Sequence, residues 1–228
     1  MFYANRLFPE IAMPKITIDF VSDVACPWCA VGLGGLLAAM ERVAGEADVE
    51  LHFRPFELNP DMPKGGQNTI ERLMAKYGYS REQVQANRKV ISERAAAVGM
   101  RMRMEDDNRS FNTFDAHRLL HWAGLQGQAG QTALKKRLLE VYHYENHDTS
   151  DAQVLARAAA DAGLDEAQAR EVLASGRYAD EVRKEEADWR DRGITSVPSV
   201  ILNGKYLVSG GQPADVFEQA LRQVAREG

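Results

Sequence analysis

The chain has 228 residues and a formal charge of −5, and 45% of its residues are hydrophobic and 27% charged. This length suits one large domain or a domain with a substantial insertion, and the acidic balance argues against a nucleic-acid surface, which is usually basic. No apolar run approaches the ~18 residues that a membrane-spanning helix needs. We therefore expect a globular protein without a nucleic-acid partner and without a membrane segment.

The first residues are expected to lie outside the fold. The stretch "MFYANRLFPEIAMPKITIDF" lacks the basic leader and apolar core of a secretory signal, because polar residues and Pro9 interrupt it. We expect the fold to begin near Pro14, which makes residues 1–13 an N-terminal extension. The chain is therefore predicted to be cytoplasmic, and a purely structural disulfide is rare in that reducing compartment.

The next 40 residues predict a strand, a helix and a second strand. Residues 15–21, "KITIDFV", alternate in polarity, which is typical of a strand, and "VELHFR" at 49–54 alternates again. Between them, residues 27–43 predict a helix with Pro27 in its first turn and an apolar stripe of Leu33, Leu36, Leu37 and Met40. Two strands joined by a helix favour a parallel βαβ unit.

A long helical block follows, and then the pattern returns to strands. Residues 66 to 192 are rich in helix formers and predict helices at 67–77, 80–97, 113–124, 129–144, 151–162, 165–174 and 177–192. After the block, "SVILN" and "KYLVS" predict two short strands joined by a two-residue hairpin turn at Asn203-Gly204, and residues 214–226 predict a last helix.

This order predicts an α/β fold that is interrupted by helices. The two mixed segments at the ends have too little apolar surface to fold alone, so we expect them to pack together. Residues 14–65 and 193–228 would then form one discontinuous domain of order β-α-β…β-β-α. Residues 66–192 would form an inserted all-helical domain.

Cys26 and Cys29 are the only two cysteines of the chain, and Pro27 and Trp28 separate them. A zinc site needs about four ligands and no other cysteine is present, so a zinc site formed by this pair is disfavoured. Two inert buried thiols are an alternative, because free cysteine is often buried. The position of the pair, after a strand and at a helix start, favours a redox motif. The helix N-terminus would stabilise Cys26 as a thiolate, while Cys29, one turn further, would close a disulfide with it.

Several longer motifs carry a resemblance to a known family: "CPWC", "FRPFELNPDMP" (53–63), "NTFDAHRLLHWA" (112–123), "VPSVILNGKYLVSGGQP" (197–213) and the "DVFEQAL" that follows. With them the chain resembles the DsbA-like thioredoxin superfamily, most closely its FrnE-like branch. The resemblance implies a thioredoxin-like fold with a helical insertion, and thiol–disulfide oxidoreductase activity. It also implies Cys26 as the nucleophile, Cys29 as the resolving cysteine, and Val197 and Pro198 as a cis-proline loop that receives the substrate.

Pro198 by itself is a weaker signal, because it suits any strand start and only ~5–6% of X–Pro bonds are cis. The β-α-β…β-β-α order favours the cis form. Two departures from the family pattern are visible. The chain has no additional cysteines, which excludes a relay through a second pair, and Ser196 stands where we expect glycine.

The sequence thus predicts a cytoplasmic oxidoreductase that exchanges disulfides with protein or small-molecule thiols and requires no metal or organic cofactor. Pro27 and Trp28 are expected to contribute to substrate binding. One alternative is a glutathione-dependent transferase or isomerase that uses Cys26 alone, as in the related 2-hydroxychromene-2-carboxylate isomerases and kappa-type glutathione transferases. The other alternative is a non-catalytic binding domain. Glutathione is a candidate small-molecule partner, and a homodimer is a candidate assembly.

Four histidines form two pairs at helical spacing, His117/His121 and His143/His147, which can bind a metal. No further ligands converge on either pair in the sequence, so we expect no metal site and expect the first pair to be hydrogen-bonded within the insertion. Asp23 could shuttle a proton for Cys26 or serve as a loop and capping residue. Trp28 could contact the substrate or pack against the insertion.

Overall fold

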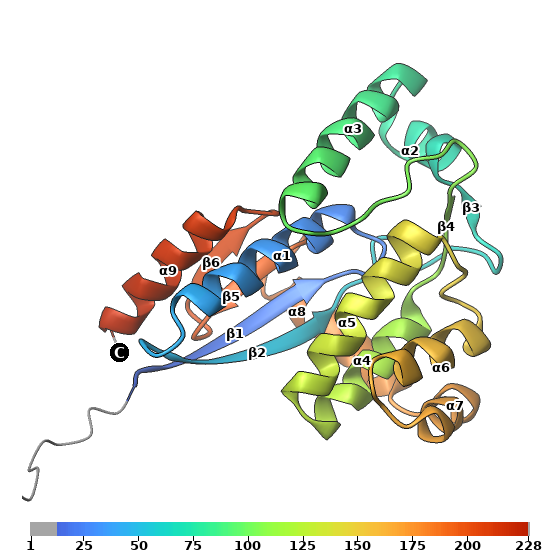
Figure 1. The fold of residues 1–228 in the computed structure, drawn as a ribbon. Helices are drawn as coiled ribbons and strands as arrows, with labels where there is room; N and C mark the ends of the chain where they lie inside the picture. The colour runs from blue at the N-terminus through green and yellow to red at the C-terminus, as the bar shows by residue number, and fades with distance from the viewer. Residues whose placement is uncertain (1–12, 228) are drawn as a thin grey trace, which may run out of the picture.

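The computed structural model describes residues 13–227 and has a four-stranded sheet at its centre (Figure 1). The strands are β1 (Lys15–Ser22), β2 (Asp48–Pro55), β5 (Ser199–Leu202) and β6 (Tyr206–Ser209), in the spatial order β2-β1-β5-β6. β1 pairs parallel with β2 and antiparallel with β5, which is the arrangement that a βαβ unit followed by a hairpin produces. The predicted extension of residues 1–13 lies, apart from Met13, outside the described residues.

Helices α1 (Pro27–Arg42) and α9 (Ala214–Glu227) cover one face of the sheet. Successive strand residues point to opposite faces, so Ile16, Ile18 and Phe20 all turn toward these helices and are fully buried. The chain that leads into α9 approaches α1 closely. A Cβ atom on Gly35 would lie 2.5 Å from the carbonyl oxygen of Gln212. This close packing fixes α1, and with it the residues at its N-terminus, on the sheet.

Helix α8 (Ala179–Asp191) covers the opposite face of the sheet. Its Trp189 belongs to a small apolar cluster with Val21 of β1 and Ile201 of β5. The side chains of these two strand residues point to the face of the sheet opposite to the one that α1 and α9 cover. We predicted this helix as part of the inserted block. In the structure it packs on the sheet, because its apolar residues match the uncovered face.

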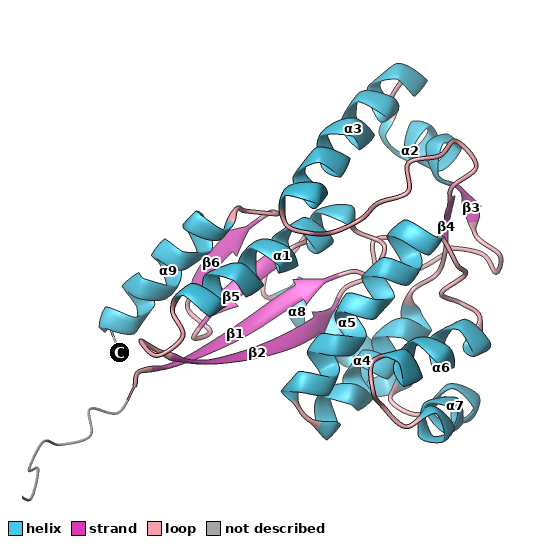
Figure 2. Cartoon of the chain, in the orientation of Figure 1, coloured by secondary structure: helices cyan, strands magenta, loops and turns pink. Residues whose placement is uncertain are grey.

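The remaining helices lie beyond β2 and above α1 (Figure 2). The helices α4 (Phe114–Gln126), α5 (Gln128–Glu140), α6 (Ala152–Asp161) and α7 (Glu166–Ser175) share an apolar core, and α4 and α5 pack this group along β2. The hairpin of α2 (Thr69–Tyr77) and α3 (Arg81–Ala97) packs on α1 instead. A ribbon of β3 (Gln67–Asn68) and β4 (Arg109–Ser110) accompanies the hairpin. Strands of two residues show no readable alternation, so the sequence did not predict them.

Two local predictions were wrong. The helix predicted for residues 129–144 ends as an α-helix at Glu140 and continues as a π-helical turn, η1 (Val141–Glu145). The hairpin has a three-residue connection, because Leu202 pairs with Tyr206. Asn203 extends the contact with β1 instead of serving only the turn: its N–H donates to Thr17 O and its Oδ1 accepts from Thr17 N, both at 2.8 Å.

Within the described part, no helix is long and apolar enough to cross a membrane.

Candidate active site

The two cysteines lie where β1 passes into α1. Cys26 is the N-cap residue of α1 and Pro27 occupies its first turn. The backbone N–H of Cys26 donates to Asp23 O at 3.2 Å, and the N–H of Cys29 donates to Cys26 O at 3.0 Å, so a tight turn holds the pair. Both thiols are free. Both thiols are buried: Cys26 retains 4% exposure and Cys29 none.

A segment distant in sequence faces Cys26. The Cys26 Sγ lies 3.6 Å from the carbonyl oxygen of Val197, although the two residues are 171 positions apart. The Val197–Pro198 peptide bond is cis. Pro198 is buried against α1, where a Cβ atom on Gly32 would lie 3.2 Å from Pro198 Cγ, so the glycine permits this close approach. The structure thus brings the predicted Val197–Pro198 loop to the predicted nucleophile.

Trp28 and Pro27 are half-buried beside the cysteines. The Trp28 ring packs on the loop after β6, because a Cβ atom on Gly211 would lie 3.1 Å from Trp28 Cε3. The glycine-rich stretch "SGGQP" therefore makes room for the indole. Of the two roles that the sequence left open for Trp28, packing is visible, and it is against this loop.

Asp23 connects the loop before Cys26 to the helical block. Its buried carboxylate accepts hydrogen bonds from the Ala25 and Leu58 N–H groups at 3.1 and 2.7 Å and from Thr113 Oγ1 at 2.8 Å. His117 Nε2 lies 3.4 Å from the same carboxylate. Burial alone would raise the pKa of Asp23, but the His117 contact and the backbone N–H groups outweigh it and hold the pKa below its usual value. Asp23 is therefore an ionised residue that fixes the loop.

A second histidine, His143, is hydrogen-bonded to Val24, the residue that follows Asp23. His143 of η1 lies with Nε2 2.9 Å from Val24 O. A carbonyl oxygen only accepts, so Nε2 carries the proton of the ring. Burial lowers the pKa of His143 to about 4, which keeps the ring neutral. We expected hydrogen bonds within the insertion for the pair that contains His117. For His117 that expectation was wrong, because α4 abuts the loop at Asp23, whereas His121 faces Glu185, which lies within the predicted insertion.

The partners of the four histidines diverge. His121 faces Glu185 at 4.0 Å and His147 faces Glu145 at 3.1 Å, whereas the other member of each pair contacts the loop before Cys26. Among residues 13–227, no group of three histidine, cysteine, aspartate or glutamate side chains is placed to hold a metal ion.

The sequence reasoning missed one buried residue, Lys135 of α5. Burial and the neighbouring Cys26 raise the pKa of Cys29 well above its usual value, and the charge of Lys135 partly opposes this effect. Lys135 is fully buried, and its Nζ has no hydrogen-bond partner. In "QTALKKRLLE" it resembles a solvated helix residue. The signal for its burial is its place on the same face as Gln131 and Leu139, four residues before and after it.

The comparisons with known proteins agree with this geometry. The model of the DSBA-like thioredoxin domain matches residues 17–222. The chain belongs to this DsbA-like family. A solved structure of a probable DsbA oxidoreductase from Streptomyces coelicolor is 38% identical, with a TM-score of 0.86 over 93% of this chain and 91% of that chain. The resemblance to the DsbA-like family and the thioredoxin-like fold class, both predicted from the sequence, are thereby confirmed.

One further sequence relative and one further solved structure are less similar to this DsbA-like chain. The uncharacterized protein YwbO of Bacillus subtilis is 27% identical over 212 residues, which cover 90% of this chain and 96% of YwbO. A structure of 2-hydroxychromene-2-carboxylate isomerase is 13% identical, with a TM-score of 0.69 over 92% of this chain and 97% of that chain. At that identity the likeness shows the shared fold alone.

Proposed function

We propose that this DsbA-like chain is a thiol–disulfide oxidoreductase in which Cys26 attacks the substrate and Cys29 resolves the mixed disulfide. The observation that carries the proposal is the contact of Cys26 Sγ with Val197 O at the N-terminus of α1, with Cys29 buried one turn further. The free N–H groups and the positive dipole end of a helix favour a thiolate, and the thiolate is the nucleophile. A buried second thiol suits a group that reacts only with its neighbour.

The exchange balances without a metal or an organic cofactor. The Cys26 thiolate attacks one sulfur of a substrate disulfide, the substrate S–S bond breaks, and one substrate thiolate leaves while Cys26 is held in a mixed disulfide. Cys29 then loses its proton and attacks Cys26 Sγ, so the second substrate thiolate leaves and a Cys26–Cys29 disulfide forms. Two electrons pass from the protein to the substrate. The reverse sequence oxidises a substrate dithiol.

The residues around Cys26 suggest how a substrate is held. Pro27, Trp28 and Val197 surround Cys26 and are half-buried, whereas Pro198 is buried. We therefore assign the direct contact with the substrate to Val197, and to Pro198 the role of supporting the Val197 backbone. Once Cys26 ionises, its sulfur no longer donates to Val197 O, and this carbonyl becomes free to accept an N–H from an extended substrate. The proposed substrates are therefore protein and small-molecule disulfides and thiols.

We also place this exchange in the cytoplasm. In a reducing compartment the only two cysteines of the chain would serve as a cycling pair, because a permanent structural disulfide is rare there. Glutathione is the proposed small-molecule partner, since it sets the thiol–disulfide balance of that compartment.

Insulin reduction with dithiothreitol, together with a redox titration against glutathione, tests the proposal. Cys26→Ser is expected to abolish exchange, whereas Cys29→Ser should still attack and accumulate mixed disulfides. Ala25→Ser is the matched control, because it adds the same hydroxyl beside Cys26 and keeps both thiols. Full turnover of protein disulfides by Cys29→Ser would contradict the two-cysteine mechanism. If that variant also retained glutathione-dependent turnover of 2-hydroxychromene-2-carboxylate, the isomerase alternative would replace it.

A further inference from the structure

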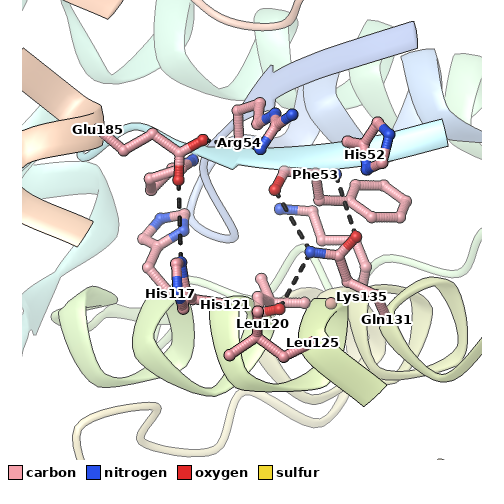
Figure 3. Close-up of a pocket in the computed structure, with 12 residues that line it drawn as sticks. His52, Phe53, Arg54, His117, Leu120, His121, Leu125, Gln131, Lys135 and Glu185 are labelled. Atoms are coloured by element: carbon pink, nitrogen blue, oxygen red, sulfur yellow. Dashed lines mark hydrogen bonds and ion pairs between the residues drawn. The ribbon is translucent and has the colours of Figure 1, made fainter. Parts of the chain in front are cut away.

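Two cavities border the helices around the cysteine pair. One of about 230 Å³ is lined by residues of β2, α4, α5 and α8 (Figure 3). Polar side chains in it already bind one another: Glu185 Oε1 lies 3.0 Å from Arg54 Nη1, and Glu185 Oε2 lies 4.0 Å from His121 Nδ1. The other cavity, of about 420 Å³, is bounded by α1, by the segment 99–102 after α3, and by α5. We call it the α1 groove, because it adjoins the helix that begins at Cys26.

The α1 groove has apolar walls. Ala30 of α1 and Leu139 of α5 line it and are buried, and Met102 packs against the same core. Met100 and Ala133, which also line it, are half-buried. Water therefore reaches apolar surface in the groove that a bound apolar group would cover.

The charged side chains at the rim are largely paired with one another. Arg101 Nη2 lies 2.6 Å from Glu140 Oε1, and Arg137 Nε lies 2.9 Å from Asp161 Oδ2. A ligand with a single charge would have to compete with these ion pairs. The groove thus offers an apolar surface inside a polar rim, which is the arrangement of a protein-binding site.

The segment with the two methionines is fixed in place beside α1 (Figure 1). The N–H of Arg103 donates to His143 O at 2.7 Å, which ties the segment to η1. At its start, Val98 packs on α1, where a Cβ atom on Gly34 would lie 2.7 Å from Val98 Cβ. The groove is therefore part of the packed structure, with walls held on both sides.

The groove and the Val197 loop lie on different sides of α1. Successive residues of a helix are rotated by about 100°, so Ala30 and Gly32, two positions apart, face nearly opposite directions. Gly32 faces Pro198, whereas Ala30 lines the groove. The N-terminus of α1 lies between the two surfaces.

The groove also extends along the turn that holds Cys26. Ala30 lies about one helical turn after Cys26. His143, another lining residue, is hydrogen-bonded to Val24 O, two positions before Cys26. A chain that crosses Cys26 therefore has the Val197 carbonyl on one side and the α1 groove on the other.

We propose that the α1 groove binds an apolar side chain of a polypeptide substrate while the cysteine of that polypeptide is joined to Cys26. This proposal rests on the proposed disulfide exchange and narrows its substrate class to extended protein segments with a large apolar residue near the cysteine. An extended chain advances by about 3.3 Å per residue, so a residue three positions from the cysteine lies about 10 Å away. That distance covers the rise of about 6 Å from Cys26 to Ala30 and the step sideways into the groove.

The shape and the lining favour a polypeptide over other occupants. Methionine side chains are flexible and polarizable, so Met100 and Met102 can adapt to different apolar partners. Glutathione has no large apolar side chain and would leave these methionines exposed. A second copy of the chain would need a protruding apolar segment to enter a groove that is bounded by α1, α5 and the segment 99–102.

Two short peptides with one cysteine each test the proposal. In both, the cysteine forms a disulfide with thionitrobenzoate; one peptide has leucine three positions before and after it, and the other has serine there. The Cys26 thiolate attacks the peptide sulfur, the peptide stays on Cys26, and thionitrobenzoate leaves with the electron pair of the broken bond, because it is the better leaving group. The reduced parent protein should react about 10-fold faster with the leucine peptide, the size of effect that filling an apolar pocket gives.

Three variants locate the effect. Met100→Glu places a charge in the groove and Ala133→Trp fills it from α5, so both should bring the ratio of the leucine and serine rates close to one. Met104→Glu is the matched control, because Met104 is a half-buried methionine of the same chain segment and lies outside the groove. It should keep the ratio of the parent.

The possible results separate the occupants. Equal rates of the parent with both peptides would overturn the proposal, and so would a parent-like ratio in both Met100→Glu and Ala133→Trp. An equal loss of rate with glutathione disulfide in these two variants would assign the groove to glutathione instead. Equal peptide rates together with a parent dimer that Met100→Glu dissociates in sedimentation would assign it to a second copy. If the parent released thionitrobenzoate from neither peptide, the proposed oxidoreductase function itself would fail.

Discussion

Replacing His143 with glutamine tests how η1 stabilises the loop before Cys26. The His143 side chain is half-buried and its Nε2 donates to Val24 O at 2.9 Å, and burial lowers the pKa from 6.5 to about 4. The folded protein therefore binds this proton only at lower pH than the unfolded chain does. The stability that depends on a neutral His143 is complete above pH 6.5 and is lost as the pH falls through about 4.

The magnitude follows from the two pKa values. The difference between 6.5 and about 4 is about 2.5 pH units, and each unit corresponds to ~1.4 kcal/mol, which gives about 3 kcal/mol for complete protonation. Between pH 7 and pH 4.5 the linkage relation predicts a loss of about 2.5 kcal/mol from this one group. Glutamine has an amide that can donate to Val24 O, but it does not titrate in this range.

Urea unfolding of the parent and of His143→Gln at a series of pH values between 7 and 4.5 measures the effect. The parent is expected to lose about 2.5 kcal/mol more than the variant across this range, since all other groups titrate in both proteins. His147→Gln is the control, because His147 lies just after η1 and its side chain is 59% exposed. Parallel stability curves for the parent and His143→Gln would refute the claim that this histidine is held neutral.

Three further changes test the packing around the site. Gly35→Ala places a Cβ atom 2.5 Å from Gln212 O and should lower the free energy of unfolding in urea by about 1–3 kcal/mol; an unchanged midpoint would contradict the close packing of α1. Gly32→Ala pushes against Pro198 Cγ and should slow insulin reduction about 10-fold with little loss of stability, so a parent-like rate would argue against the role of the Val197 loop. Arg183→Met removes the cation that is hydrogen-bonded to the buried Glu57 and Glu186 carboxylates, and should cost about 2 kcal/mol at neutral pH and less as acid protonates Glu57, whose pKa burial raises. Exposed Lys184→Met on the same helix should leave the stability unchanged.

Local chemistry made much of the fold readable from the sequence. The alternation of Ile16, Ile18 and Phe20 identified β1 and its buried face, because a strand turns successive side chains to opposite sides. Pro27 marked the first turn of α1, and the two cysteines at that turn indicated which chemistry to look for. The family motifs then indicated the Val197–Pro198 loop, a partner that no local pattern could have placed near Cys26.

Local rules were insufficient where tertiary contacts compete with them. The sequence predicted an ordinary helix through residues 129–144, but packing on the loop at Val24 accompanies a π-helical turn that presents His143 to it. The Asn203-Gly204 pair has the composition of a two-residue turn, yet Asn203 is hydrogen-bonded to Thr17 of β1 and the connection has three residues. In each case a neighbour distant in sequence decides the local geometry.

By itself, then, the sequence determined the order of strands and helices and the place of the cysteine pair, because these depend on residues close together in the chain. Only the tertiary structure decided what surrounds the pair. Asp23, His117, Lys135 and His143 come from four separate segments and meet behind the cysteines. Lys135 has the sequence environment of a surface residue, and it is buried only because α5 packs against β2. Burial and charge compensation depend on all the elements that close around a group, and no stretch of the chain encodes them alone.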